Sequence, residues 1–429
     1  MLDSYFKLAE HHTNARTEVL AGLTTFLTMA YITVVNPAIL ADAGMDFGAV
    51  FVATCLAAAL GTAIMGLYAN YPIALAPGMG LNAYFAYAVV GGMGYHWSVA
   101  LGAVFLSGIL FIVLSLLPVR EWIINAIPRG LKLAISAGIG LFLAIIALKN
   151  AGVVVDNPAT LVTLGDPASW PVILSFCGFF VMVALDRLKV PGAVIIGILA
   201  TTAAGLALGV SDWRGIASLP PNPMPTFLQL DIAGAMQVGL IAIVFTFLFV
   251  DLFDTAGTLI GLAHRAGMLD DQGRLPRLKK ALLADSTATA AGALLGTSTT
   301  TSYIESAAGI NAGGRTGLTA LTVAALFLLA LFFSPLAQTV PSYATAPALL
   351  FVACLMARGL AEIDWDDVTE AAPAVVTAIT MPLTFSIATG MGIGFISYAA
   401  IKILSGKGAE CPPAVYAIAA LFLVKFYLV

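Results

Sequence analysis

Long apolar stretches separated by short polar breaks recur from residue 17 to the end of the chain. A helix needs about 20 mainly apolar residues to cross the hydrocarbon core of a bilayer. The pattern therefore predicts about fourteen spans, at residues 17–41, 49–69, 71–91, 96–117, 128–149, 169–186, 190–209, 233–261, 280–296, 298–313, 316–335, 344–360, 369–388 and 390–404. A last apolar stretch at 412–428 is either a further span or the second half of a broken one.

The third and tenth predicted segments are interrupted. Pro72, Pro77, Gly78 and Gly80 prevent an unbroken helix in YPIALAPGMGLNAYFAYAVVGG. The threonines and the tyrosine of GTSTTTSYIESAAGINAGG favour an extended backbone. Each segment is predicted to form a short strand that leads into a half-helix. Non-helical backbone at membrane depth is tolerated only where it lines a cavity or pairs inside the protein, and the free N–H groups at half-helix starts can bind a ligand.

The two interrupted segments occupy matching places in two halves of the chain, which meet at the Pro-rich connection LPPNPMPTF near residue 225. The fifth segments also match, since NAIPRG and QTVPSY both begin at an Ile-Pro or Val-Pro step. Seven spans in each half would place the second copy upside down in the membrane. Inverted repeats with interrupted segments are typical of secondary transporters, whose binding site lies near the midplane. The predicted fold class is an all-α polytopic membrane protein.

Composition and charge agree with this pattern. The chain is 60% apolar and only 10% charged, with a mean hydropathy of +0.99, whereas soluble domains carry about 25% charged residues. If the N-terminus is cytoplasmic, the lysines and arginines except Lys149, Arg214 and Lys425 fall on the cytoplasmic side. We expect a multi-pass protein of the cell membrane with its N-terminus inside. The four cysteines have no metal-ligand or disulfide spacing, so neither a metal site nor a disulfide framework is predicted. No cofactor is expected.

Acidic residues inside apolar sequence are the main candidates for chemistry. Asp251 and Asp254 lie in AIVFTFLFVDLFDTAGTLIG, and Glu305 lies in GTSTTTSYIESAAGI. A carboxylate at bilayer depth costs at least about 2.5 kcal/mol and is retained mainly for function. The small polar residues around Asp254 favour it as the acid that faces a cavity, while Asp251 would pair with a hydroxyl or a cation. All three acids are candidates for proton coupling, and a structural, hydrogen-bonded role is the alternative for each.

Other polar residues allow two interpretations. Glu305 can bind a ligand or simply cap the second half-helix. Asn82, just after the first break, offers a donor and an acceptor to a heterocycle, or satisfies nearby backbone. Asp285 in LLADSTATAAG is interpreted as part of a helix start at the cytoplasmic edge.

Four motifs make the chain resemble the AzgA-like nucleobase permeases, which carry adenine, guanine and hypoxanthine. They are NPAIL (36–40), APGMGLNAYF (76–85), FVDLFDTAGTLIG (249–261) and TSTTTSYIESAAGINAGGRTGLTA (297–320). The resemblance covers essentially the whole chain and implies the fold shared with uracil and xanthine permeases, with two inverted seven-segment repeats. It implies core domains at residues 1–118 and 233–338 and gate domains at 119–232 and 339–429.

The resemblance also implies a site and a mechanism. By motif, the residues expected around the base are Asn82, Ala83, Asp254, Thr258, Ile304 and Glu305. The family further implies proton symport, an elevator movement of core against gate, and a homodimer formed through the gate domains. The uracil and xanthine relatives carry Glu where this chain has Asp254, and the shorter side chain suits a bulkier purine.

The leading hypothesis is therefore a purine base importer whose partners are the base, protons and the lipid bilayer, with no nucleic acid. An anion carrier of the same architecture is the alternative, although two cavity acids would repel an anion. A membrane-embedded enzyme would need a nucleophile-base or metal constellation, and a passive channel would need polar rings along its pore. The preferred purine, the coupling ion (proton or sodium) and the acid that titrates stay open.

Overall fold

The computed structural model describes residues 2–117, 127–268 and 275–428. Helices of the first half are α1 (Leu2–Phe6), α2 (Ala15–Met29), α3 (Ile32–Asp42), α4 (Phe47–Ile64), α5 (Met79–Ala83), α6 (Trp97–Leu116), α8 (Arg129–Asn150), α9 (Trp170–Arg187) and α10 (Ala193–Ala207), with π-helical turns η1 (Met65–Ala69) and η2 (Tyr84–Gly92). Helices of the second half are α11 (Ile232–Ala235), α12 (Val238–Ala266), α13 (Leu278–Leu295), α14 (Ser306–Asn311), α15 (Gly317–Ala330), α16 (Ser334–Thr339), α17 (Ser342–Ala357), α18 (Val368–Leu383), α19 (Ile387–Leu404) and α20 (Pro413–Leu428), with short 3-10 turns η3 (Leu331–Phe333), η4 (Arg358–Glu362) and η5 (Gly408–Glu410).

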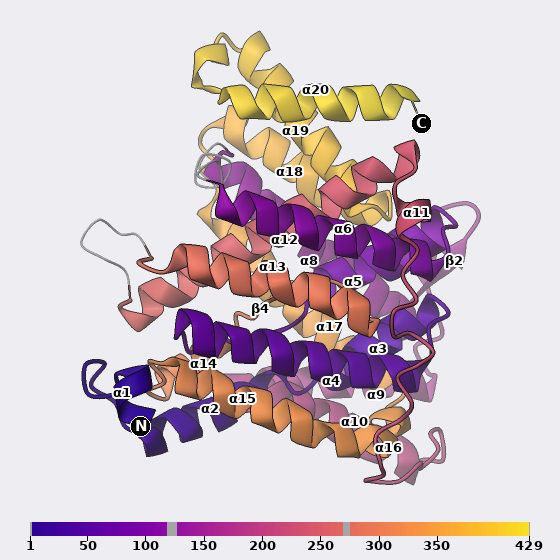
Figure 1. Ribbon diagram of the computed structural model, residues 1–429. Helices are drawn as coiled ribbons and strands as arrows, with labels where there is room; N and C mark the ends of the chain where they lie inside the picture. The colour runs from indigo at the N-terminus through magenta and orange to yellow at the C-terminus, as the bar shows by residue number, and fades with distance from the viewer. Residues whose placement is uncertain (1, 118–126, 269–274, 429) are drawn as a thin grey trace.

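The long helices lie roughly parallel to one another, as expected for a chain that crosses a membrane many times (Figure 1). Within the described residues, 9 helical stretches are long and apolar enough to span a bilayer. Three shorter apolar helices join them, at Ala193–Ala207, Val368–Leu383 and Pro413–Val424. When the two broken segments and the less apolar helix α13 are added, the count agrees with about fourteen spans and one extra C-terminal helix.

The helices form two packed groups. The first bundle consists of α2, α3, α4, α6, α12, α13 and α15, which pack mainly against one another. The second bundle consists of α8, α9, α10, α17, α18 and α19, with α20 packed along α19. Each bundle contains helices from both halves of the chain.

Side-chain caps fix the beginnings of several spans. Asn14 accepts a hydrogen bond from the Thr17 N–H at the start of α2, and Asp46 accepts one from the Ala49 N–H at the start of α4. Such caps satisfy N–H groups that have no partner in their own helix. Glu18, buried in α2, caps a different helix, because its carboxylate accepts N–H bonds at the start of α15.

The broken segments meet inside the first bundle. Strand β1 (Leu75–Pro77) pairs antiparallel with β4 (Thr300–Ser302), although these strands lie in different halves of the chain. β1 leads into α5 and η2, and β4 leads into α14. Both strands are completely buried, so their pairing satisfies backbone groups that would otherwise lie unpaired at membrane depth. The predicted strand and half-helix in segments three and ten are confirmed.

Two local features differ from the sequence-based expectations. A second pair of strands, β2 (Val154–Asn157) and β3 (Leu161–Leu164), forms a hairpin in the connection between α8 and α9. That hairpin was not predicted, because its flanking residues carry no long alternating pattern. The span expected at 233–261 is instead the short α11 followed by the separate α12, which extends to Ala266.

Candidate functional site

The paired strands hold the starts of both half-helices in one place. The Gly78 N–H, between β1 and α5, donates to the Thr299 carbonyl at 2.9 Å and so extends the ladder. A Cβ atom at Gly78 would lie 2.6 Å from the Thr301 side chain. Only glycine therefore allows the two segments to approach this closely.

Glu305 stands directly before α14, but its side chain does not cap that helix. Instead, the Tyr31 hydroxyl, completely buried between α2 and α3, donates to Glu305 Oε1 at 2.6 Å. The Thr28 hydroxyl lies 3.4 Å from the Glu305 carbonyl oxygen. The helix-cap alternative is thus not realised, and the carboxylate is directed by a tyrosine from another span.

Asp254 on α12 is the second acid of this region. It lies close to Glu305, because α12 packs against both β4 and α14, the elements on either side of Glu305. Both side chains are half-buried, and Asp254 has no hydrogen bond or ion pair with any described residue. The surface beside them is open, because a Cβ atom at Gly257 would meet nothing within 4 Å and Ile304 is 44% exposed. The described chain therefore covers the two acids only in part.

A third acid, Asp285 on α13, lies in the centre of the first bundle rather than at its edge. It is completely buried and accepts hydrogen bonds from the Thr255 hydroxyl at 2.8 Å and the Ser302 hydroxyl at 2.9 Å. Thr255 and Thr301 are also hydrogen-bonded to each other, at 2.7 Å. The interpretation of Asp285 as a helix start at the membrane edge was wrong. The small polar run DSTATAAG that it begins was the signal for close packing against β4.

Asp251, also on α12, is buried in the same interior as Asp285. Its Oδ2 atom lies 3.0 Å from the Thr289 hydroxyl, which is also 2.8 Å from the Thr300 carbonyl of β4. Asp251 thus meets a hydroxyl, as the sequence suggested for the acid that does not face the cavity. Together with Asp285, it ties α12 and α13 to the strand that precedes Glu305.

Asn82 in α5 is held by the other broken segment. The Ser298 hydroxyl donates to Asn82 Oδ1, while Asn82 Nδ2 is buried and has no partner among the described residues. Ala83 next to it is also completely buried. Thr258 is buried on α12, one turn after Asp254. No hydrogen bond among the described residues connects Asn82 to Asp254 or Glu305. The two N–H groups of its side-chain amide remain available as donors.

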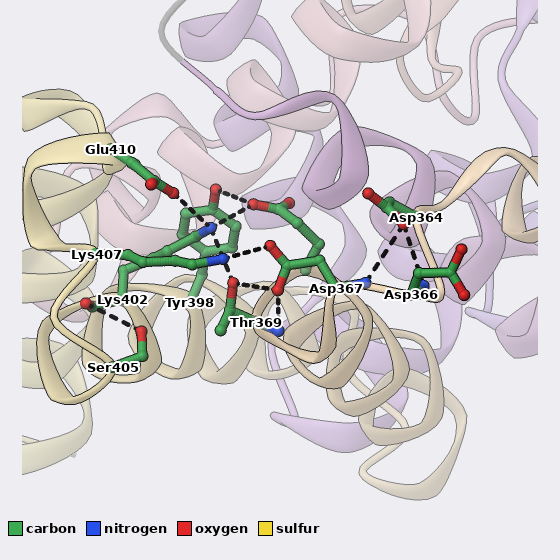
Figure 2. A network of polar contacts seen from close by, with 10 residues as sticks. Asp364, Asp366, Asp367, Thr369, Tyr398, Lys402, Ser405, Lys407 and Glu410 are labelled. Carbon is green, nitrogen blue, oxygen red and sulfur yellow. Dashed lines mark hydrogen bonds and ion pairs between the residues drawn. The ribbon is translucent and has the colours of Figure 1, made fainter.

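A second polar region lies in the second bundle, where α18 begins and α19 ends. Lys402 and Lys407 point toward acidic side chains there (Figure 2). Lys402 Nζ lies 2.7 Å from Glu370, which also accepts from the Tyr398 hydroxyl at 2.7 Å. Lys407 Nζ lies 2.7 Å from Asp367. The hydrogen bond from Lys407 holds the pKa of Asp367 well below its usual range.

A cavity of about 300 Å³ opens between the two bundles. Its polar lining comes from Asp42 at the end of α3, Asn150 at the end of α8, Arg214 and Gln338. None of the residues expected around the base lines this cavity. The cavity is therefore separate from Asp254 and Glu305.

Comparisons with known proteins agree with this architecture. A family model described as a permease family matches residues 16–393. The chain is 49% identical to the adenine permease AdeP of Escherichia coli, covering 100% of this chain and 96% of that protein. It is 48% identical to the guanine/hypoxanthine permease PbuO of Bacillus subtilis, covering 99% and 100%.

Solved structures share the fold. The transmembrane domain of a cyanobacterial bicarbonate transporter, BicA, superposes with a TM-score of 0.69 at 15% identity, covering 87% of this chain and 97% of that one. SLC26A9 superposes with a TM-score of 0.65 at 12% identity, covering 91% and 65%. At these identities the likeness concerns the fold alone.

Proposed function

The chain belongs to this permease family, and from that premise we propose that it is a secondary active transporter that imports purine nucleobases. It is a transporter and not an enzyme. Relatives over nearly the full length are named for adenine and for guanine/hypoxanthine, so the purine class is supported while the preferred purine stays open.

The observation that carries this proposal is the pair of half-buried acids, Asp254 and Glu305, beside the paired starts of two half-helices. Purine bases present N–H groups and ring nitrogens along flat edges. Carboxylate oxygens accept from the N–H groups, and the free N–H₂ of Asn82 can donate to a ring nitrogen. Backbone at Ala83 and Ile304 and the side chain of Thr258 complete the proposed pocket.

Selectivity would follow from polar groups left without partners. A base that lacks the matching N–H leaves a carboxylate or amide unsatisfied, and such a buried group costs about 1–3 kcal/mol. An anion would meet two like charges, which disfavours the alternative of an anion carrier despite the fold shared with a bicarbonate transporter.

We further propose that uptake is coupled to protons. No lysine or arginine among the described residues pairs with Asp254 or Glu305. Two nearby carboxylates without a cation favour a state in which one of them carries a proton. A proton taken up from outside and released inside would then drive import. Asp251 is the third candidate for this role.

The movement that we propose is an elevator displacement of a core against a gate. The first bundle, which holds the acids and both strands, would be the core, and the second bundle would be the gate. The placement of lysines and arginines supports a cytoplasmic N-terminus in the cell membrane. A homodimer formed through the gate is part of this proposal and rests on the resemblance to the family.

Uptake into proteoliposomes tests the proposal. Radiolabelled adenine, guanine, hypoxanthine, xanthine and uracil would be offered with and without an inward proton gradient. We expect gradient-driven uptake of one or more of adenine, guanine and hypoxanthine. Uptake driven by sodium alone would refute proton coupling, and no uptake of any base by folded protein would refute the purine assignment.

A further inference from the structure

Tyr31 is packed in the main apolar core and also makes a polar contact with Glu305. It lies at the turn where α2 ends and α3 begins, and its carbonyl accepts N–H bonds from Val34 and Val35. Its ring is completely buried, and its hydroxyl reaches across to Glu305, 274 residues away in sequence. An aromatic side chain fixed at both ends in this way can hold another group in one orientation.

The contact distinguishes the two oxygens of Glu305. Oε1 accepts from the Tyr31 hydroxyl at 2.6 Å, and Tyr31 is the one described residue whose side chain is hydrogen-bonded to this carboxylate. The titratable groups that face Glu305 are Tyr31, Asp254 on α12 and Tyr303 on its own segment. The Tyr303 hydroxyl is already used, because it donates to the Pro77 carbonyl at 2.5 Å. Tyr31 is thus the group that directs the carboxylate.

We propose that Tyr31 is a positioning residue, which holds Glu305 Oε1 so that Oε2 is the oxygen presented to the base. This inference rests on the proposed function and assigns a residue that contacts Glu305 rather than the substrate. Because Oε1 stays an acceptor for Tyr31, a proton carried by Glu305 resides on Oε2. The protonation of Glu305 then decides whether Oε2 accepts a hydrogen bond from the base or donates one to it, which links binding of the base to the protonation of Glu305.

The test is Tyr31→Phe, with Tyr398→Phe as its matched control. Both substitutions remove one hydroxyl that donates to a glutamate Oε1, at 2.6 Å in the first case and 2.7 Å in the second. The control lies in the second bundle, away from the proposed pocket. Uptake in proteoliposomes would be measured against base concentration and against pH, and folding would be checked by melting in detergent.

For Tyr31→Phe we expect the KM for the transported purine to rise about tenfold, the size expected for one hydrogen bond to a charged group. The maximal rate should change less than KM, and the pH profile of uptake should shift. Tyr398→Phe should change neither KM nor the pH profile. Should Tyr31→Phe fail to fold, Thr28→Val removes a hydroxyl that donates to the Thr25 carbonyl at 2.7 Å and lies 3.4 Å from the Glu305 carbonyl oxygen. This change beside Glu305 should raise KM in the same direction but less.

Three outcomes would contradict the inference. A folded Tyr31→Phe protein with wild-type KM and pH profile would overturn it, and so would equal changes in Tyr398→Phe. If Tyr31→Phe does not fold, an unchanged KM in Thr28→Val would overturn it too. In each of these cases, purine uptake by the wild type would still support the proposed function. Absence of purine uptake by the wild type would instead overturn the proposed function, and this inference with it.

Discussion

Two regions of this protein bring carboxylates together inside or beside the membrane, and they do so in opposite ways. In the second bundle, Glu370 and Asp367 each meet a lysine at 2.7 Å, and Figure 2 shows Lys407 beside Asp367. In the first bundle, Asp254 and Glu305 meet no cation among the described residues. Both regions contain a tyrosine hydroxyl bonded to a glutamate. The difference therefore lies in the counter-charge.

The comparison separates structural acids from functional ones. A lysine that is 3% exposed is costly to bury alone, and its pairing with Glu370 offsets that cost. The network then joins the ends of α18 and α19 without leaving a charge unbalanced. Asp254 and Glu305 have no such cation among the described residues, so the free-energy cost of burying their charges is not offset. Buried charges of this kind are retained where a substrate or a proton supplies the missing partner.

The largest effect is expected from Asp254→Asn. The substitution keeps the shape of the side chain but removes its charge and its capacity to take up a proton. We expect at least a hundredfold loss of purine uptake, about 2.7 kcal/mol, with the melting temperature unchanged or raised. Initial uptake rates in proteoliposomes check this. Asp46→Asn is the control, since asparagine caps α4 as well as aspartate; equal losses in both would contradict the assignment.

Substitutions in the second bundle should lower the stability of the protein and leave its KM for the base unchanged. Lys402→Met leaves Glu370, whose side chain is 23% exposed, without its cation. Because Glu370 keeps some contact with solvent, we expect a destabilisation of about 2 kcal/mol, below the range for a fully buried pair. The double variant Lys402→Met with Glu370→Gln should recover most of it. Thermal melting and KM are the measurements, and a changed KM with normal melting would place Lys402 in the transport site.

A smaller effect is expected from Thr255→Val, which removes a hydroxyl bonded to Asp285. Asp285 keeps Ser302 as a donor, so the loss should be about 1 kcal/mol of stability. Uptake should fall less than tenfold, because Asp254 and Glu305 are not touched. Abolished uptake in a protein of normal melting temperature would show that Asp285 belongs to the site itself.

The smallest effect concerns Asp367 and Lys407. Because the pKa of Asp367 is lowered in the folded protein, its contribution to stability is present above the ordinary value of 3.8 and is lost as pH falls through the lower folded value. Lys407→Met should therefore melt earlier than the wild type at pH 7, with the gap closing below pH 3.8. If the difference in melting temperature between Lys407→Met and the wild type were the same below pH 3.8 as at pH 7, the lower stability would come from lost packing of the Lys407 side chain instead.

Much of the first bundle could be predicted from the sequence, because its signals are local. Pro77 and Gly78 forbid a helix, and the threonines before Tyr303 favour a strand. Asp254 and Glu305 stand out as charges in apolar surroundings. Each of these inferences needs only a few neighbouring residues.

Contacts between distant segments could not be predicted in the same way. Tyr31 is one aromatic residue within an apolar span, and nothing near it in sequence indicates a partner in the tenth segment. Asp285 follows a basic stretch, which suggested a membrane edge, yet the small residues after it allow α13 to pack closely against β4. The pairing of Lys402 with Glu370 likewise depends on how α18 and α19 are placed.

The central claim is that the uncompensated acids of the first bundle carry transport, whereas the compensated acids of the second bundle carry structure. The most direct test compares Glu305→Gln with Glu370→Gln in proton-gradient-driven purine uptake. We predict that Glu305→Gln loses or uncouples uptake while its melting temperature is retained, and that Glu370→Gln lowers the melting temperature while the protein that remains folded transports normally. Normal coupled uptake by Glu305→Gln, or loss of coupling in folded Glu370→Gln, would contradict the account.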